Sequence, residues 1–171
     1  LAEGILYTCG KLRTPGRVDH GNTLLDNYEI ERERGITVFS KQANVSYKDR
    51  NITLLDTPGH VDFCAEMERT LQVLDAAILV VSCSDGITGH TVTLWRLLEA
   101  YKIPTYIFVN KTDLAGADKK KVYENLRKNC NDGIIDFTAY SACDNEIMEE
   151  ISLCSEKLLD EYAQNGSFSD S

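Results

Sequence analysis

The sequence is short of basic residues. It contains 18 lysines and arginines against 27 aspartates and glutamates, so its formal net charge is −9. A domain that coats nucleic-acid phosphates presents a basic face, and this balance therefore argues against such a module and against a DNA partner. Contact with RNA through another domain stays compatible with the sequence.

Long apolar runs are also absent. No stretch approaches the roughly 18–20 consecutive apolar residues that a membrane-spanning helix needs, so we expect no membrane partner. Residues Leu1 to Gly4 lack the basic region of a signal peptide, and a cytoplasmic location is expected. The chain does not begin with methionine, which indicates a fragment of a longer protein.

Paired metal-binding cysteines are missing as well. The six cysteines are scattered, with no Cys-x-x-Cys pair and no zinc-finger spacing. Because 43% of the residues are apolar, the chain can build a core without disulfide staples. We expect reduced thiols, as in a cytosolic protein.

The N-terminal part of the sequence changes from helical spacing to alternation. Residues 1–9 have the spacing of a helix that stops at Gly10. Residues 38–47 alternate between apolar and polar side chains, a turn covers 48–51, and a strand resumes at 52–55. This pattern predicts an antiparallel hairpin.

The rest of the sequence alternates between helices and continuous apolar runs. The runs at 76–81 and 105–109 are typical of strands that are buried on both faces. The helical segments are 63–74, a segment with Trp95, Leu98 and Tyr101 on one side, 122–126, and a final helix over 147–162. This order predicts an α/β fold with a doubly wound, mostly parallel sheet and one antiparallel hairpin strand.

Polar residues follow the strand at 52–55. In open α/β sheets, ligands bind beyond the carboxyl ends of the strands, where Asp56-Thr57-Pro58-Gly59-His60 stands. The Asp56 carboxylate can hold Mg²⁺ through its water shell, and the Thr37 hydroxyl offers a second hard oxygen ligand. Gly59 lets a backbone N–H approach a phosphate, and His60 can position or polarise an attacking water.

The strand at 105–109 leads into Asn110-Lys111-Thr112-Asp113. Guanine presents two donors on one edge, and the single carboxylate of Asp113 can accept both. Adenine lacks both donors and would leave that carboxylate desolvated and unpaired, so such a site discriminates strongly. Lys111 can lay its stem along the base plane, and Asn110 can tie the loop together and reach the other edge of the base.

Each of these motifs is weak by itself. Asp-Thr-Pro-Gly is usually plain turn chemistry, and Asn-Lys-x-Asp alone carries little information. Both motifs directly after buried strands, with a helix and a strand between them, favour a guanine nucleotide site. Other residues have plainer interpretations: a solvated His20, a structural His90, a core Trp95, and a solvated helix start at Lys119–Lys121, for which an RNA contact is the alternative.

These segments resemble the GTPase domain of translational GTPases. The resemblance covers nearly the whole chain, and its most specific stretches are Glu31-Arg32-Glu33-Arg34-Gly35-Ile36-Thr37 and Asp56 to Phe63. Among these GTPases, the chain is most similar to elongation factor G and to the tetracycline-resistance ribosomal-protection proteins. Residues 16–27 look more like the latter.

The resemblance implies a P-loop-NTPase-like fold and GTP hydrolysis on the ribosome, with Mg²⁺ as cofactor. It implies a switch I region at 10–37 and a switch II region at 56–66, both ordered by the γ-phosphate and released on hydrolysis. In the protection proteins, this cycle drives tetracycline off the ribosome.

The residues that the resemblance implies share one ligand, GTP with its Mg²⁺. His60 is the expected catalytic residue, because it matches the residue that orients the hydrolytic water. Thr37 and Asp56 are the expected metal ligands. The expected GTP-binding residues are Thr37, Asp56, Thr57, Pro58, Gly59, His60, Asn110, Lys111, Thr112 and Asp113.

One motif of these GTPases is missing from the sequence. The phosphate loop, G-x-x-x-x-G-K-[ST], should precede the first helix. Gly4 to Lys11 is a decoy, because five residues separate Gly4 from Gly10 where four are needed, and Leu12 follows the lysine. We expect the first strand to be missing too, and we therefore expect this chain alone to bind GTP weakly or not at all.

Residues 1–171 are therefore expected to form a single partial GTPase domain, with the start of a family insertion and a tail at about 131–171. Ser141-Ala142 is either the loop that backs the guanine or an ordinary loop before the last helix. The sequence leaves alternatives to this function: translocation of the elongation factor G type, and a nucleotide-incompetent module that only docks to a partner. An unrelated α/β nucleotide protein is a third, which residues 31–37 argue against.

Overall fold

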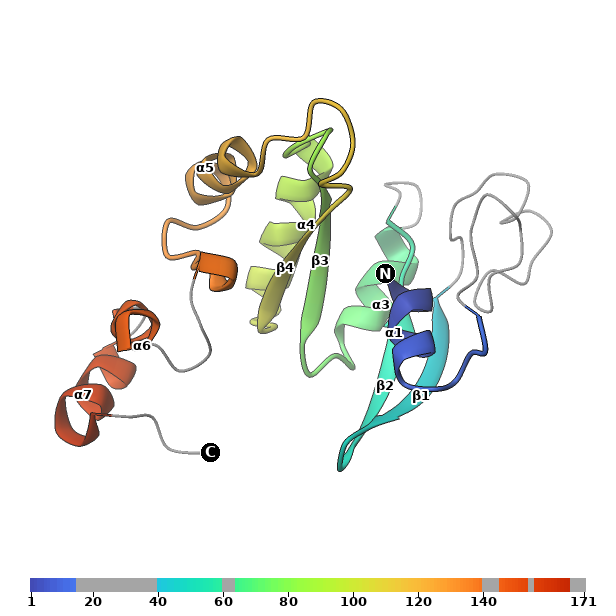
Figure 1. Ribbon diagram of the computed structural model, residues 1–171, viewed down its shortest axis with the longest axis horizontal. Helices are drawn as coiled ribbons and strands as arrows, with labels where there is room; N and C mark the ends of the chain where they lie inside the picture. Colours follow the sequence, from blue (N-terminus) through green and yellow to red (C-terminus); the bar gives the residue numbers. More distant parts are fainter. Residues whose placement is uncertain (15–39, 60–63, 140–144, 154–155, 167–171) are drawn as a thin grey trace. The chain divides into compact units, whose positions relative to one another are not determined.

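The chain divides into two compact units. The computed structural model describes residues 1–14, 40–59, 64–139, 145–153 and 156–166. The units are Leu1–Ala77 with Leu98–Thr105, and Ile78–Leu97 with Tyr106–Ser171. Figure 1 shows their helices and strands.

The first helix, α1, spans Ala2–Thr8 and ends in a glycine-based cap. Gly10 has φ 72°. The N–H of Gly10 donates to the Tyr7 carbonyl at 3.0 Å, and the N–H of Lys11 donates to the Leu6 carbonyl at 2.9 Å. This pair of bonds is a Schellman motif, in which a left-handed glycine lets the chain satisfy the last helical carbonyls. The predicted stop at Gly10 is confirmed.

Strands β1 (Lys41–Tyr47) and β2 (Arg50–Asp56) form the predicted antiparallel hairpin. Lys41 lies opposite Asp56 at the open end of this ladder. The two-residue turn that joins the strands contains Lys48 at φ 51°. Positive φ in such a turn matches the right-handed twist of the paired strands.

Helix α1 packs against the hairpin (Figure 1). Leu6 and Val45 are almost completely buried in this small core, and the residues packed around them are Ala2, Cys9, Leu12 and Ala43. The alternation in β1 predicted this inward face, because successive side chains of a strand point to opposite sides. Gly4 lies within the helix, so the decoy that begins there is not a phosphate loop.

Helix α3 (Cys64–Leu71) follows the predicted spacing. Met67 and Leu71 are buried, and so is Thr70, a polar residue beside them. Phe63, which was predicted on the same stripe, lies outside the described residues.

The second sheet is parallel, as predicted. Its elements in chain order are β3 (Ala77–Ser82), α4 (Gly89–Ala100) and β4 (Thr105–Asn110). The N–H of Ala77 donates to the Pro104 carbonyl at 2.9 Å, and the N–H of Cys83 donates to the Asn110 carbonyl at 2.8 Å. The constant offset between donor and acceptor shows that the two strands run in the same direction.

One face of this sheet is not buried, contrary to the prediction. Leu79 and Val81 are buried. The side chains of the other face are between 42% and 62% exposed: Ile78, Val80, Tyr106 and Phe108. The register pairs 78 with 106 and 80 with 108, so these four side chains lie together. A continuous apolar run predicts cover on both faces, and the described part of the chain covers only one.

Helix α4 carries part of its predicted apolar stripe. Leu98 is buried and Trp95 is partly buried, whereas Tyr101 lies beyond the helix end and is 42% exposed. The indole nitrogen of Trp95 and both ring nitrogens of His90 are buried, without a hydrogen-bond partner in the described part of the chain. The polar atoms of both rings are therefore shielded from solvent, as expected of structural residues.

Helix α5 (Lys119–Asn129) begins at a side-chain cap. The Asp118 carboxylate accepts a hydrogen bond from the N–H of Lys121 at 3.0 Å, which satisfies one of the free donors of the first turn. Val122 and Leu126 are buried, as the spacing predicted.

The helix predicted over 147–162 is wrong in its extent, because two helices occupy this range. They are α6 (Asn145–Ser152) and α7 (Glu156–Asn165), and a short 3-10 helix, η3, precedes them at Phe137–Ala139. The Ser152 hydroxyl donates to the Glu149 carbonyl at 2.7 Å. A serine that bonds to a carbonyl one turn back competes with the helical ladder, which favours the end of α6 at this residue.

Candidate functional site

The end of β2 carries the first group of candidate residues. Asp56 is the last residue of the strand, and it and Thr57 are partly exposed. Pro58 is less than 2% exposed, so its buried ring fixes the direction in which the chain leaves the sheet. Asp56 is therefore held at a strand end, with its carboxylate within reach of solvent.

Neither steric crowding nor a left-handed backbone requires glycine at position 59 in the described part of the chain. A Cβ added to it would have no atom within 4 Å, and its φ is not in the left-handed region. Glycine is retained for a special φ or for the close approach of another group to the backbone. The first reason does not apply to Gly59, and the space beside its Cα is open in the described part of the chain.

The end of β4 carries the second group. The Asn110 carbonyl accepts the N–H of Cys83 at 2.8 Å, so the start of the loop is tied to the neighbouring strand. Lys111 then takes φ 57°, a conformation that costs a non-glycine residue about 1–2 kcal/mol. The Lys111 carbonyl accepts the N–H of Leu114 at 3.4 Å, which closes a turn.

The side chains of this loop face solvent. Asn110 is partly exposed, and Lys111, Thr112 and Asp113 are exposed. The loop is therefore held by backbone hydrogen bonds, and its Asp113 side chain is exposed. A left-handed lysine is an uncommon feature that the fold tolerates at this position.

Several expected residues cannot be placed. Thr37 and His60 lie outside the described residues, as does Ser141-Ala142. Asp56–Gly59 belongs to the first unit and Asn110–Asp113 to the second. Their expected convergence on one nucleotide therefore stays a prediction.

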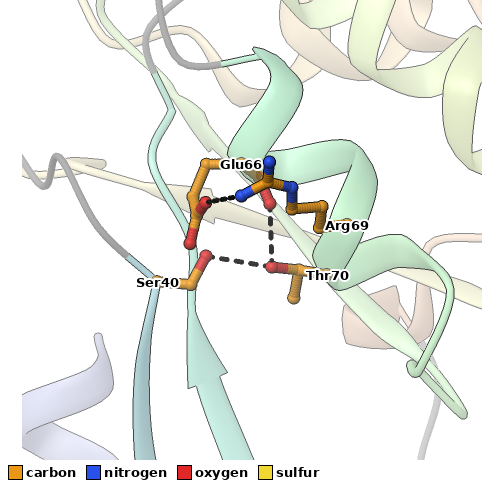
Figure 2. A network of polar contacts seen from close by, with 4 residues as sticks. All are labelled: Ser40, Glu66, Arg69 and Thr70. Atoms are coloured by element: carbon orange, nitrogen blue, oxygen red, sulfur yellow. Dashed lines mark hydrogen bonds and ion pairs between the residues drawn. The ribbon is translucent and has the colours of Figure 1, made fainter.

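Sequence reasoning missed a polar contact between the start of β1 and α3 (Figure 2). The Ser40 and Thr70 hydroxyl oxygens are 2.9 Å apart, and the Thr70 hydroxyl also donates to the Glu66 carbonyl at 3.1 Å. The Glu66 carboxylate lies 3.6 Å from the Arg69 guanidinium. Thr70 falls on the apolar stripe of α3, and a hydroxyl at such a position needs a partner, which is the signal that could have revealed this contact.

The described residues contain no group of three or more His, Cys, Asp or Glu side chains that could hold a metal ion. Magnesium that is bound with a nucleotide does not need such a cage, because phosphate oxygens and waters fill most of its positions. Within the described part of the chain, no helix has the length and apolar character to cross a membrane.

Comparison with known proteins identifies close relatives. Tetracycline resistance protein TetP of Clostridium perfringens is 44% identical over 135 residues, which cover 79% of this chain and 21% of the relative. Tetracycline resistance protein TetO of Streptococcus pneumoniae is 37% identical over 177 residues, covering 98% and 28%. Elongation factor G 2 of Borreliella burgdorferi is 48% identical over 124 residues, covering 72% and 18%.

The chain thus spans between 18% and 28% of the length of these relatives. A solved structure from Thermus thermophilus has a TM-score of 0.80 over 98% of this chain and 31% of its own, at 24% identity, which shows the same fold. The mixed α/β architecture expected from the sequence is thereby confirmed. The model of the Elongation factor Tu GTP binding domain family matches residues 1–165. The chain belongs to the Elongation factor Tu GTP binding domain family.

Proposed function

We propose that this chain is the GTP-binding and GTP-hydrolysing domain of a translational GTPase that acts on the ribosome in the cytoplasm. The observation that carries this proposal is the family match over residues 1–165. The exposed Asn110–Asp113 loop at the end of a parallel strand supports it. Relatives named as tetracycline resistance proteins align with up to 98% of the chain, which supports a ribosomal-protection protein as the parent, the longer protein to which this chain belongs.

The loop after β4 binds the guanine base. The Asp113 carboxylate accepts the N1–H and the 2-amino group in a bidentate pair, and its exposure leaves room for this edge of the base. The stem of Lys111 covers the base plane, and the Asn110 side chain ties the loop together, with Thr112 between them.

The loop after β2 belongs to the phosphate side of the site. Asp56 offers a hard carboxylate oxygen at a strand end, which fits Mg²⁺, and the Thr37 hydroxyl is its partner ligand. When bound, Mg²⁺ neutralises charge on the phosphates. Thr57, Pro58 and Gly59 bring a backbone N–H toward the γ-phosphate, and His60 orients the attacking water.

The domain organisation follows from these roles. Switch I covers 10–37, switch II covers 56–66, and a family insertion with a tail begins at about residue 131. GTP, GDP and the ribosome are the partners, and neither a membrane nor DNA is one.

An alternative parent is a translocation factor of the elongation factor G type. It is favoured by the identity of 48% to elongation factor G 2, which is higher than that to TetO but covers only 72% of the chain. A second alternative is a nucleotide-incompetent module. It is favoured by the missing phosphate loop, whose amides and lysine hold the β- and γ-phosphates.

The deciding experiment is a titration with a fluorescent GDP analogue in the presence of Mg²⁺. It uses this chain and a version extended upstream by about 20 residues, enough for a strand and a phosphate loop. We expect the extended version to bind at least about a hundredfold more tightly, because the missing phosphate contacts return. An extended version that binds no guanine nucleotide, or that binds ATP equally well, would refute the proposal.

A second experiment separates the two parents. Cells that carry the natural gene are challenged with tetracycline. Protection from tetracycline identifies a resistance protein. If the gene gives no protection but supports translocation, the elongation factor alternative is correct.

A further inference from the structure

Helix α5 (Figure 1) concentrates positive charge in an otherwise acidic chain. Five of the 18 lysines and arginines of the sequence lie on its 11 residues, together with a single acid, Glu124. The structure places Lys119–Lys121 in the first turn of this helix, where all three side chains are exposed. Cations at this end oppose the helix dipole, so the stability of the helix does not account for them.

Most of these cations lie on the side of α5 that faces away from the core. At about 100° per residue, Lys120, Lys121, Arg127 and Lys128 fall within roughly a third of the helix circumference. The two buried side chains of the helix, at 3% and 2% exposure, lie on the opposite side. All four cations are exposed, and none has an ion pair within the described part of the chain. We call these four side chains the cationic face of α5.

Arg127 is held in position by an aromatic ring. Its guanidinium carbon lies 5.9 Å from the centre of the Tyr123 ring, which is a cation–π contact. The Tyr123 hydroxyl donates to the Ile134 carbonyl at 3.1 Å, and this bond fixes the ring. Because Arg127 is exposed, its planar group can stack on a nucleobase or donate to a phosphate.

The composition of this face discriminates between classes of anionic partner. A helix that binds a membrane surface inserts an apolar face, whereas Val122 and Leu126 of α5 are already buried in the fold. The centres of protein–protein interfaces are depleted of charged residues, whereas the cationic face consists of them. RNA phosphates match its charge, and unpaired RNA bases match the stacked Arg127.

We infer that the cationic face of α5 is a docking surface for RNA that has an unpaired loop. Lys120, Lys121 and Lys128 neutralise phosphates, and Arg127 stacks on an unpaired base. Duplex DNA offers the phosphates but no unstacked base. The net charge of −9 repels RNA from the rest of the chain, so binding should be local and sensitive to salt. This inference goes beyond the proposed function, because it needs neither GTP nor the residues that would bind it.

The test is a titration of a fluorescein-labelled RNA hairpin, which has an unpaired uridine loop, with this chain of 171 residues. Fluorescence anisotropy gives the affinity at several KCl concentrations, because counterion release makes phosphate contacts sensitive to salt. The unlabelled competitors are the same RNA hairpin, a DNA duplex, polyglutamate, and vesicles of phosphatidylserine and phosphatidylcholine. At equal amounts of negative charge, the RNA hairpin should compete at least about tenfold better than the other three.

The first variant replaces all four residues of the cationic face by glutamine, which has nearly the same helix propensity as lysine and arginine. At about 0.1 M KCl, its affinity for the RNA hairpin should be at least about tenfold lower. The slope of log affinity against log salt concentration should become shallower by about 2–3, since each lost phosphate contact removes roughly 0.7.

A matched control separates this surface from net charge. It replaces three lysines and one arginine that are exposed elsewhere by glutamine, so the net charge changes equally: Lys11, Lys48, Arg50 and Lys102. Its affinity for the RNA hairpin should change by less than about threefold. Arg127→Lys keeps the charge and removes the planar group, so it should weaken binding about threefold at an unchanged salt slope.

Three results would overturn the inference and leave the proposed function standing. They are equal losses in the two glutamine variants, an unsubstituted chain that does not bind the RNA hairpin, and a competitor of another class that matches the RNA hairpin. If circular dichroism shows that the cationic-face variant has lost helix, Arg127→Lys decides the question. An unchanged affinity in that variant then overturns the inference.

Discussion

The two strand-end loops of this protein obtain their shape in different ways. The loop after β4 is shaped by backbone features: the bond from the Cys83 N–H at the end of the neighbouring strand to the Asn110 carbonyl, the left-handed Lys111, and the turn that the Lys111 carbonyl closes. The loop after β2 leaves its strand through the buried Pro58, so its shape depends on packing in its own unit.

On the proposed function, this difference distinguishes the loop that would bind the base from the loop that would face the phosphates. A loop with its own backbone hydrogen bonds can present a specificity residue such as Asp113 before any ligand arrives. The loop after β2 would offer Asp56 and Gly59 to the phosphates, and the buried Pro58 lies between these two residues. Base specificity should therefore depend on single side chains, and phosphate binding on the packing behind the loop.

The largest expected effect comes from Asp113→Asn. An amide cannot accept both guanine donors, so the affinity for GDP should fall roughly a hundredfold. The same amide can donate to the extra carbonyl of xanthine, so the preference should move to xanthosine diphosphate. Competition titrations with both nucleotides, carried out on the version extended upstream by about 20 residues, measure this change. A variant that still prefers GDP would remove Asp113 from the base site.

A smaller effect is expected from Pro58→Ala. The substitution removes a buried ring and frees the unfolded chain, so the free energy of unfolding should fall by about 1–2 kcal/mol. Pro104→Ala is the matched control, because Pro104 is exposed and contributes only its carbonyl, which alanine retains. Urea titrations of both variants measure the difference. Equal losses would show that burial of Pro58 does not hold the loop.

The smallest effect separates the backbone of Lys111 from its side chain. Lys111 and Lys102 have nearly the same positive φ, 57° and 55°, so glycine at either position should change the free energy of unfolding by less than about 1 kcal/mol. In the version extended upstream, only Lys111→Gly should weaken GDP binding, about fivefold, because the base loses the apolar stem that covers it. Equal GDP affinities in the two variants would place Lys111 outside the base site.

Much of the fold could be predicted because its signals are local. The alternation at Ala43 and Val45 predicted an inward strand face, and Gly10 predicted the end of α1. Two predictions failed where the outcome depends on context. The apolar run of β3 carries no information on which face of the strand is covered. The apolar periodicity over 147–162 continues past Ser152, so it did not indicate that α6 ends at this residue.

The candidate site divides in the same way. The loops at 56–59 and 110–113 could be located from sequence, because a strand end followed by a motif is a local pattern. The left-handed Lys111, the buried Pro58 and the Ser40–Thr70 contact could not, because each depends on groups that are distant in sequence or on backbone angles. The roles of Thr37 and His60 stay predictions from the resemblance.

The face of the β3–β4 sheet that no described residue covers affects how the isolated chain behaves in solution. An exposed apolar patch crosses these two neighbouring strands and consists of Ile78, Val80, Tyr106 and Phe108. Such a patch binds to hydrophobic resins and to chaperones, and it promotes aggregation as the protein concentration rises. Preparations of these 171 residues should therefore stay monomeric longest when they are dilute and at low salt. Under these conditions the net charge of −9 on each molecule is least screened, so repulsion between molecules opposes aggregation.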